Sequence, residues 1–311
     1  MSLNPQGKVR IVSLAPNVTS ILLAIGAGRE LVGVSKWCKD VADVGRRPQV
    51  GDCWKMNIDE VMRLGPTILI GSVPFAPDTV AKILAESVTF VAINPRSLAD
   101  IERDISTLGR IANRAANAEK LILKMRSSFE SVARAAQGCL TNPLRQGTAF
   151  YPELRRLAVS KRTPNPGLST LVAEASHEIS RKAGRAMRSN PAHTKHRPRV
   201  YCEAWPKPRI SSPPWVRELI EIAGGRMVGA AGERVTDEEV AREKPDLIVL
   251  AWAATGDRAK PSNALRNPAW QDVPAVKNRR VFVIRDELLN TPGPPLIKGA
   301  WELLRVIHGT S

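Results

Sequence analysis

Tryptophan is the residue type whose placement in this sequence most clearly suggests a binding chemistry. Five of the chain's seven tryptophans lie in or next to predicted loops, where an indole ring is not needed to pack a helix. They are Trp37, Trp54, Trp205, Trp215 and Trp252. Indole faces suit a large planar ligand with apolar edges. We assign Trp215 to a hydrophobic core and interpret the other four as candidate walls of a binding cleft.

The sequence motifs of common enzyme mechanisms are missing. There is no GxSxG, no P-loop and no HExxH. Residues 26–28 (GAG) follow a predicted helix rather than a strand, which argues against a dinucleotide site. His193 and His196 form an HxxH pair, but a basic, proline-flanked context is typical of a solvated segment, and neither His177 nor His308 lies in a predicted cleft loop. We therefore predict that the protein is not an enzyme and has no metal site of its own.

Cysteine usage and the start of the chain bear on where the protein works. None of the four cysteines forms a CxxC pair. Cys38 and Cys53 fall in one predicted loop region and could form a disulfide after export, although four free thiols is the interpretation we favour. The opening residues MSLNPQGKVR contain no apolar leader. We expect a periplasmic or cell-surface protein if a leader has been trimmed, and a cytoplasmic one if the sequence is complete.

The positive charge of the chain is concentrated in one segment. The formal net charge is +16, and residues 138–197 contain eleven Lys/Arg against three Asp/Glu, a net of +8. This distribution favours an anionic partner or surface for that segment over a uniformly basic fold.

Strand and helix patterns alternate through the rest of the chain, which predicts parallel sheets covered by helices. Predicted strands cover 9–14, 31–35, 67–71, 88–93, 199–202, 247–250 and 280–284, and predicted helices include 18–25, 57–64, 78–86, 215–223, 236–244 and 296–307. Ligands of such sheets sit beyond the carboxyl ends of the strands. The loops expected there supply the candidate ligand-binding residues, which are Pro16, Asn17, Trp37, Trp54, Lys55, Trp205, Ser211, Ser212, Trp252 and Asn290.

The two halves of the chain repeat each other. Residues 57–63 (NIDEVMR) align without gaps with residues 236–242 (TDEEVAR), and Pro66 then aligns with Pro245 at the same offset of 179 residues. Each segment begins with a helix-capping residue followed three positions later by glutamate, and each ends at a proline before an apolar strand. A constant offset through a cap, an acidic pair, a proline and a strand indicates internal duplication.

A long helix is predicted between the halves. Residues 114–137 contain neither glycine nor proline. Their apolar residues recur every three or four positions, at Leu121, Met125, Phe129, Val132 and Ala136. A helix of this length reaches roughly 35 Å. We therefore predict two Rossmann-like α/β lobes, residues 1–113 and 198–311, joined by one rigid helix (114–137) and followed by a basic insertion (138–197), partly without fixed structure.

Several segments, in this order, resemble a known family. They are RIVSLAPNVTSILLAIGAG, LVGVSKW, VGDCWKMNIDEVMRLGPTILIG, EAWPKPRISSPPW and VTDEEVAREKPDLIVL. Together they are similar to the helical-backbone metal-receptor group, the substrate-binding proteins of ABC importers for corrinoids, ferric siderophores and haem. The resemblance covers roughly residues 8–137 and 198–308, and the tryptophan-rich loops and the EAW…SS..W segment are most similar to cobalamin-binding members.

This resemblance implies a partner and a docking chemistry. In the family, one carboxylate on each lobe docks onto arginines of the membrane permease. Those positions fall on Asp59 and Glu238, with Glu60 and Glu239 as neighbours that could substitute. Both carboxylates lie in the first turn of a predicted helix, where the helix dipole favours negative charge. Simple helix capping explains Glu60 and Glu239 well, and Asp59 and Glu238 less well.

Three functions therefore remain under consideration. The first is capture of a corrinoid for an ABC importer by a monomeric protein. The second is capture of a ferric siderophore or haem in the same fold, for which Arg209 and Arg234 are candidate anion-binding residues. The third, from another class, is binding of nucleic acid or an anionic surface through the basic insertion, and nucleic acid is the partner we favour least.

Overall fold

The computed structural model describes residues 8–141, 197–253, 255 and 258–309. Residues 168–187, where the sequence predicts a modest helical stretch, lie outside the described residues. So do His193, His196 and nearly all of the basic insertion. The hypothesis of an anionic partner for the insertion therefore stays a prediction.

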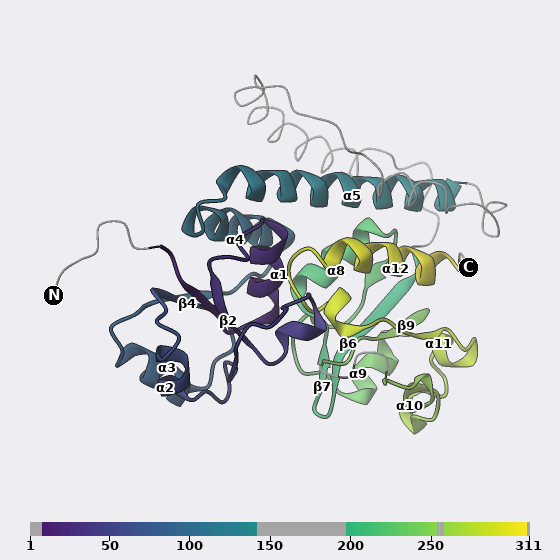
Figure 1. The fold of residues 1–311 in the computed structure, drawn as a ribbon. Helices are drawn as coiled ribbons and strands as arrows, with labels where there is room; N and C mark the ends of the chain where they lie inside the picture. Colours follow the sequence, from purple (N-terminus) through teal and green to yellow (C-terminus); the bar gives the residue numbers. More distant parts are fainter. Residues whose placement is uncertain (1–7, 142–196, 254, 256–257, 310–311) are drawn as a thin grey trace, which may run out of the picture.

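The N-terminal lobe, at the left of Figure 1, is built on a five-stranded parallel sheet with the strand order β3-β2-β1-β4-β5. Short, β-branched and fully buried sequences form its centre, as expected for strands covered on both faces. The strands are β1 (Ile11–Ser13), β2 (Leu31–Ser35), β3 (Gln49–Val50), β4 (Ile68–Ser72) and β5 (Thr89–Ile93). The helices between them are α1 (Pro16–Ala24), the 3-10 turn η1 (Cys38–Asp40), α2 (Ile58–Met62), α3 (Pro77–Leu84) and α4 (Leu98–Ile111).

The C-terminal lobe repeats this plan with one difference. Its sheet has the order β10-β9-β6-β7, with β8 paired to β6, and every pairing is parallel except that of β6 with β7. The strands are β6 (Arg199–Pro206), β7 (Arg209–Ser211), β8 (Arg226–Met227), β9 (Leu247–Leu250) and β10 (Val281–Val283). Around them lie α8 (Pro214–Ile222), α9 (Asp237–Arg242), α10 (Pro261–Leu265), η3 (Pro268–Trp270), α11 (Pro274–Lys277), η4 (Asp286–Leu288) and α12 (Leu296–His308).

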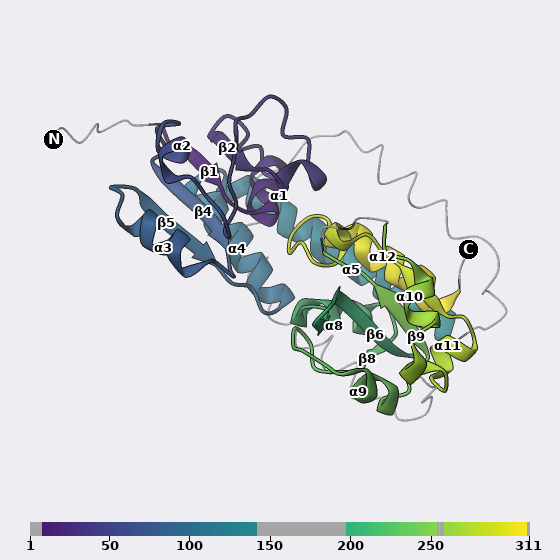
Figure 2. The same ribbon diagram turned by 90° about the horizontal axis from the view of Figure 1, so that it is seen from below.

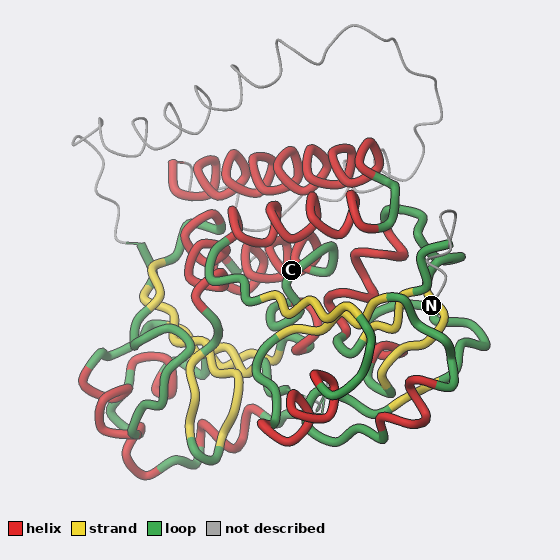
Figure 3. The backbone as a smooth tube through the Cα atoms, turned by 90° about the vertical axis from the view of Figure 1, so that its left-hand side faces the viewer, coloured by secondary structure: helices red, strands yellow, loops and turns green. Residues whose placement is uncertain are grey.

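One helix, α5 (Ala115–Thr141), runs along both lobes. Its 27 residues span about 40 Å. Figure 2 shows α5 passing behind the two sheets, and Figure 3 shows it on the helical side of the molecule with the strands beneath. All five residues of the predicted apolar stripe are buried in one core that also contains residues of α4, α8 and α12. The predicted pair of α/β lobes joined by a long helix is confirmed.

The structure corrects three details of the sequence interpretation. The long helix extends to Thr141 rather than ending at residue 137. Residues 205–212, expected as a loop, contain the end of β6 and all of β7, because the chain turns back as an antiparallel edge hairpin at Lys207-Pro208. The pattern 98–111, for which no helix was predicted, forms α4 with Ser97 as its N-cap. Among the described residues, no helix is long and apolar enough to cross a membrane.

Candidate ligand-binding cleft

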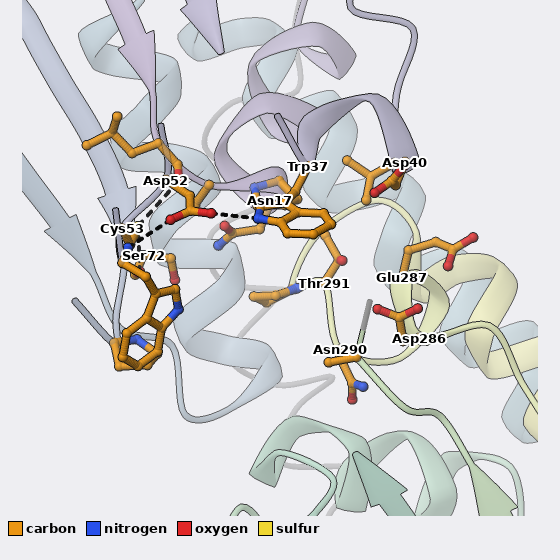
Figure 4. Close-up of a pocket in the computed structure, with 18 of the residues that line it drawn as sticks. Asn17, Trp37, Asp40, Asp52, Cys53, Ser72, Asp286, Glu287, Asn290 and Thr291 are labelled. Carbon is orange, nitrogen blue, oxygen red and sulfur yellow. Dashed lines mark hydrogen bonds between the residues drawn. The ribbon is translucent and has the colours of Figure 1, made fainter. Parts of the chain in front are cut away.

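A cavity of about 660 Å³ opens between the two lobes. Its N-lobe wall consists of loops that follow the carboxyl ends of β1, β2, β3 and β4. Its C-lobe wall consists of Trp215, Ala253, Thr255, Arg258 and residues of the segment 285–292. The location agrees with the rule that ligands of parallel sheets lie beyond the carboxyl ends of the strands. Trp37, Trp54 and Trp215 all contribute to the lining, and Figure 4 shows residues of both lobes facing the same space.

Trp37 is held at the cleft wall by a carboxylate. Its indole Nε1–H donates to Asp52 Oδ2 at 2.7 Å, while 40% of the residue stays exposed (Figure 4). Lys36 lies on one side of this pair, with Nζ 3.5 Å from Asp52 Oδ2 and 4.8 Å from the Trp37 ring centroid. Trp37 therefore has one face near an ammonium group and an open edge toward the cleft.

Trp54 lies on a tight loop that the same carboxylate organises. Asp52 Oδ1 accepts from the backbone N–H of Trp54 and of Lys55, both at 3.0 Å. Burial alone would raise the pKa of Asp52, but the hydrogen bonds from Lys55, Trp37 and Trp54 outweigh it, and the pKa is lowered. The Asp52 carboxylate is therefore charged at neutral pH. The Trp54 residue on this loop is 63% exposed at the cleft.

Acidic and basic side chains alternate around the rest of the cavity. The lining includes the carboxylates of Asp40, Asp52, Asp286 and Glu287 and the cations of Lys39, Arg258 and Arg285. Arg285 Nε forms a close ion pair with Glu287 Oε1, so this guanidinium is already neutralised. The charged groups of the lining consequently have no strong bias toward one sign of charge.

The inner end of the cleft carries two amides. Asn17, in the first turn of α1, is buried, and its Nδ2 has no hydrogen-bond partner among the described residues. Asn290 Nδ2 donates to Ala251 O at 2.6 Å, whereas its Oδ1 has no described partner. Figure 4 shows Asn17 and Asn290 coming from opposite lobes.

The structure brings together half of the candidate ligand residues predicted from sequence. Pro16, Asn17, Trp37, Trp54 and Asn290 line the cavity, and Lys55 is exposed on the adjoining loop. Trp215 is buried as predicted and donates to Leu289 O at 2.9 Å. The remaining candidates lie elsewhere in the described structure: Ser211 and Ser212 are buried, Trp205 is exposed on the β6–β7 hairpin, and Trp252 lines a different cavity.

That second cavity, of about 410 Å³, lies within the C-terminal lobe around a buried ion pair. Glu203 is fully buried and ion-paired with Arg209, which also donates from Nε to Asp237 Oδ1 at 2.6 Å. Glu203 additionally accepts from Trp252 Nε1 at 2.8 Å and from Tyr201 Oη at 3.0 Å. Arg209, a candidate anion-binding residue from the sequence, is thus committed to a structural network, and Arg234 is exposed outside both cavities.

Cys38 and Cys53 are free, buried thiols with separate hydrogen-bond partners. Thr19 Oγ1 donates to Cys38 Sγ at 3.0 Å, and Cys53 Sγ donates to Leu14 O at 3.3 Å. Burial raises the pKa of Cys53 to about 11, with a smaller contribution from the charge of Asp52, so this thiol is protonated at neutral pH.

The proposed docking carboxylates occupy matched positions in the two lobes. Asp59 and Glu238 are each the second residue of a short helix, and both are exposed, as are Glu60 and Glu239. Figure 1 shows α2 and α9 on the side of the molecule opposite α5. Whether these groups dock a permease stays a prediction.

Sequence reasoning missed the residue that organises the N-lobe wall. Asp52 was not a candidate, because its role depends on a loop that closes only in the folded chain. One available signal was its position two residues before Trp54, since Asp side chains commonly accept from the backbone N–H two positions on. Asp40, Asp286 and Glu287 had no comparable signal, and among the described residues no group of three or more His, Cys, Asp or Glu side chains is arranged to hold a metal ion.

Two α/β lobes, a spanning helix and an interlobe cleft define a solute-binding protein of the rigid-helix type. The chain belongs to the periplasmic binding protein family Peripla_BP_2, whose sequence model matches residues 11–143 and 172–288. This is a family of solute-binding transport proteins, and the family resemblance found in the sequence is confirmed.

Individual relatives agree with this assignment. The chain is 22% identical to YvrC, described as an uncharacterized ABC transporter substrate-binding lipoprotein of Bacillus subtilis, over 96% of this chain and 80% of the relative. Its fold is similar to that of the periplasmic heme-binding protein RhuT from Roseiflexus (TM-score 0.68, 20% identity, 98% and 99% of the two chains). It is also similar to the periplasmic vitamin B12-binding protein BtuF of Vibrio cholerae (TM-score 0.65, 18% identity, 97% of each chain).

Proposed function

We propose that this protein is the substrate-binding subunit of an ABC importer and captures a corrinoid of the cobalamin type in the interlobe cleft. The observation that carries the proposal is the pair of exposed indoles, Trp37 and Trp54, on one wall of a 660 Å³ cavity. Such a wall suits a broad ring system with apolar edges. By analogy with the lipoprotein relative, the protein works outside the cytoplasm, in the periplasm or at the cell surface.

The chemistry of the cleft favours a corrinoid over haem. Haem iron is held in proteins by a side chain such as histidine, tyrosine, methionine or a cysteine thiolate. The described residues that line the cleft include no His, Tyr or Met, and Cys53 is buried with its pKa raised to about 11. A corrinoid whose cobalt already carries its axial ligands needs only shape, apolar contact and hydrogen bonds from the protein.

The cleft offers an anionic ferric siderophore no excess of positive charge. Four carboxylates face three cations across the lining, and one of those cations, Arg285, is paired with Glu287. The arginine candidates for such a ligand, Arg209 and Arg234, are not among the lining residues. The unpartnered amide atoms of Asn17 and Asn290 instead match the carboxamide groups at the edge of a corrin.

The direct test is to mix the purified protein with excess cyanocobalamin, desalt the mixture and record its visible spectrum. We expect corrin absorbance to elute with the protein at close to a one-to-one ratio. Parallel samples with haemin and with a ferric hydroxamate siderophore provide the alternatives. A colourless protein after cyanocobalamin, together with retained haemin or ferric siderophore, would overturn the proposed ligand.

The indole wall is tested by truncation. We expect W37A and W54A each to weaken cyanocobalamin binding roughly 10-fold, because each removes a large apolar contact. The control is L84A, which truncates an exposed apolar side chain (69%) on α3, outside the cleft lining, and leaves the affinity unchanged. The affinities are measured by fluorescence titration. Wild-type affinity in W37A and W54A as well as in L84A would show that the ligand binds elsewhere.

Permease docking is a separate part of the proposal. Asp59 and Glu238 are exposed at equivalent helix positions, so a two-fold permease can accept both at once. We expect D59K and E238K together to abolish co-purification with the cognate permease and to leave cyanocobalamin affinity intact. Normal association of the double variant would rule out these residues as the docking pair.

A further inference from the structure

The two cleft tryptophans lack the packing that normally orients an indole. With 40% of Trp37 and 63% of Trp54 exposed, much of each ring meets solvent rather than protein. An exposed side chain samples several rotamers, and ordering it on ligand binding costs free energy. A cleft wall made of such residues therefore depends on another group to hold the rings in a binding orientation.

Asp52 is the group that contacts both. One of its oxygens accepts the Trp37 indole N–H at 2.7 Å, and the other accepts the backbone N–H of Trp54 at 3.0 Å. The first bond fixes the ring of Trp37 directly. The second fixes the backbone from which the Trp54 side chain leaves. A single carboxylate thus fixes the ring of Trp37 and the backbone position from which the Trp54 side chain leaves.

The loop that carries Asp52 is itself anchored, so the carboxylate is the fixed partner. Asp52 N donates to Lys55 O at 3.1 Å, and Cys53 O accepts from Ala76 N at 2.9 Å. The loop closes so tightly that a Cβ on Gly51 would lie 2.2 Å from Lys55 O. Only glycine allows that approach, which explains the residue at this position.

Lys36 makes the arrangement one-sided. Its ammonium lies 4.8 Å from the Trp37 ring centroid and 3.5 Å from Asp52 Oδ2. The ammonium therefore competes with a ligand for the ring face on its own side. A planar ligand has unhindered access only to the rest of the ring, on the cleft side.

We propose that Asp52 is the positioning residue of the cleft, holding Trp37 through its indole and Trp54 through its backbone in the orientation that meets the ligand. The proposal rests on the proposed function for the ligand, but the orientation of the indoles is independent of it. By ordering the Trp37 ring and the Trp54 backbone before binding, Asp52 lowers the entropic cost of capture. Asp52 need not touch the ligand itself.

The test compares D52A and D52N with a matched control, D43N. Asp43 Oδ1 accepts from the backbone N–H of Gly45 at 2.9 Å in the same manner, but its described bonds include no indole. The first readout needs no ligand: the ¹H–¹⁵N resonance of the Trp37 indole and acrylamide quenching of Trp37 and Trp54. The second is affinity for cyanocobalamin. W37F, which keeps a ring but removes the indole donor, covers the case in which D52A does not fold.

We expect D52A to shift the Trp37 indole resonance, to increase quenching and to weaken cyanocobalamin binding roughly 10-fold. D52N, which keeps one acceptor oxygen, should lose roughly 3-fold, and D43N should match the wild type. An unchanged resonance and quenching in D52A would overturn the proposal, and so would unchanged affinity despite a shifted resonance. If the wild type binds no cyanocobalamin, the proposed ligand fails, and the resonance and quenching data still decide whether Asp52 orients the indoles.

Discussion

Each lobe contains a hydrogen bond between a carboxylate and an indole N–H, but the two bonds serve different roles. In the N-terminal lobe, Asp52 accepts from Trp37, and the indole remains exposed at the cleft. In the C-terminal lobe, Glu203 accepts from Trp252, and the carboxylate is fully buried. The first pair is surrounded by backbone donors and a solvated lysine, whereas the second is neutralised by Arg209.

The surroundings of each carboxylate account for the difference. A carboxylate held by backbone N–H groups stays charged near water and can orient side chains at a surface. A carboxylate with no exposure needs a paired cation, and the pair then fixes the elements around it. Here Arg209 also reaches Asp237 at the start of α9, so the C-lobe network supports the fold around its second cavity rather than the cleft wall.

The largest expected effect comes from removing the cation in the C-terminal lobe. R209A leaves Glu203 buried without its counter-charge, and we expect a loss of about 3–5 kcal/mol in the free energy of unfolding. The matched change in the N-terminal lobe, K36A, removes a cation that is 54% exposed and should cost under about 1 kcal/mol. Urea denaturation of both variants measures the difference, and similar losses would contradict the contrast drawn between the lobes.

A third carboxylate, Asp104 on α4, is partly buried. Its Oδ2 has no hydrogen-bond partner among the described residues, and burial raises its pKa to about 6, with Asp100 adding to the effect and Arg103 opposing it. The folded protein therefore holds this proton more tightly than the unfolded chain. Stability is lost as pH rises from about 4 to about 6, and the full penalty is present above that window.

We accordingly expect D104N to stabilise the protein by about 1–2 kcal/mol at pH 8, a value discounted for the partial exposure of the group. The gain should vanish at pH 4, where the wild-type carboxyl is protonated. Urea denaturation of wild type and D104N at the two pH values gives the comparison. A D104N effect that does not change between them would show that Asp104 does not titrate as inferred.

The smallest contrast lies in the caps of α2 and α9. Thr236 and Glu239 form a reciprocal capping box on α9, with bonds of 3.1 and 2.8 Å between side chain and backbone. Asn57 caps α2 at 3.1 Å, but Glu60 accepts from the Asn57 side chain instead of its backbone. T236A should cost about 1 kcal/mol and N57A about 0.5 kcal/mol. Hydrogen exchange of the α2 and α9 amides compares them, and a larger effect for N57A would reverse the ranking.

The repeat at offset 179 carried much of the correct fold prediction. Residues 57–63 and 236–242 both form capped helices, and the strands that follow, β4 and β9, take equivalent central places in their sheets. These features depend on local propensity and burial, which the sequence displays directly. The helix α4 was also encoded, by Ser97 and a regular apolar spacing, and was overlooked.

The cleft was less predictable because its geometry is set by contacts distant in sequence. The chain reverses at Lys207-Pro208, so residues expected as one cleft loop form an edge hairpin. Ser211, at the end of β7, and Ser212 after it are buried. Trp252 was a candidate cleft residue because of its type and loop position. Its indole instead donates to Glu203, 49 positions away in the sequence. Asp52 reaches Trp37 across 15 residues. The sequence shows which residues lie in loops. The direction in which a loop side chain points depends on its hydrogen-bond partners, which lie far away in the sequence.

The apolar face of α5 has a consequence for how the molecule comes apart. Residues along this helix, including Leu121 and Val132, belong to one cluster that continues into Ile105 on one side and Leu219 on the other. Each lobe also has a smaller hydrophobic core of its own, around Leu69 in the N-terminal lobe and around Trp270 in the C-terminal lobe, but the largest cluster is shared between them. Because the largest cluster is shared, the two halves should not unfold independently. We expect denaturant to unfold both halves in a single transition. A half expressed alone would leave its share of that cluster exposed to water.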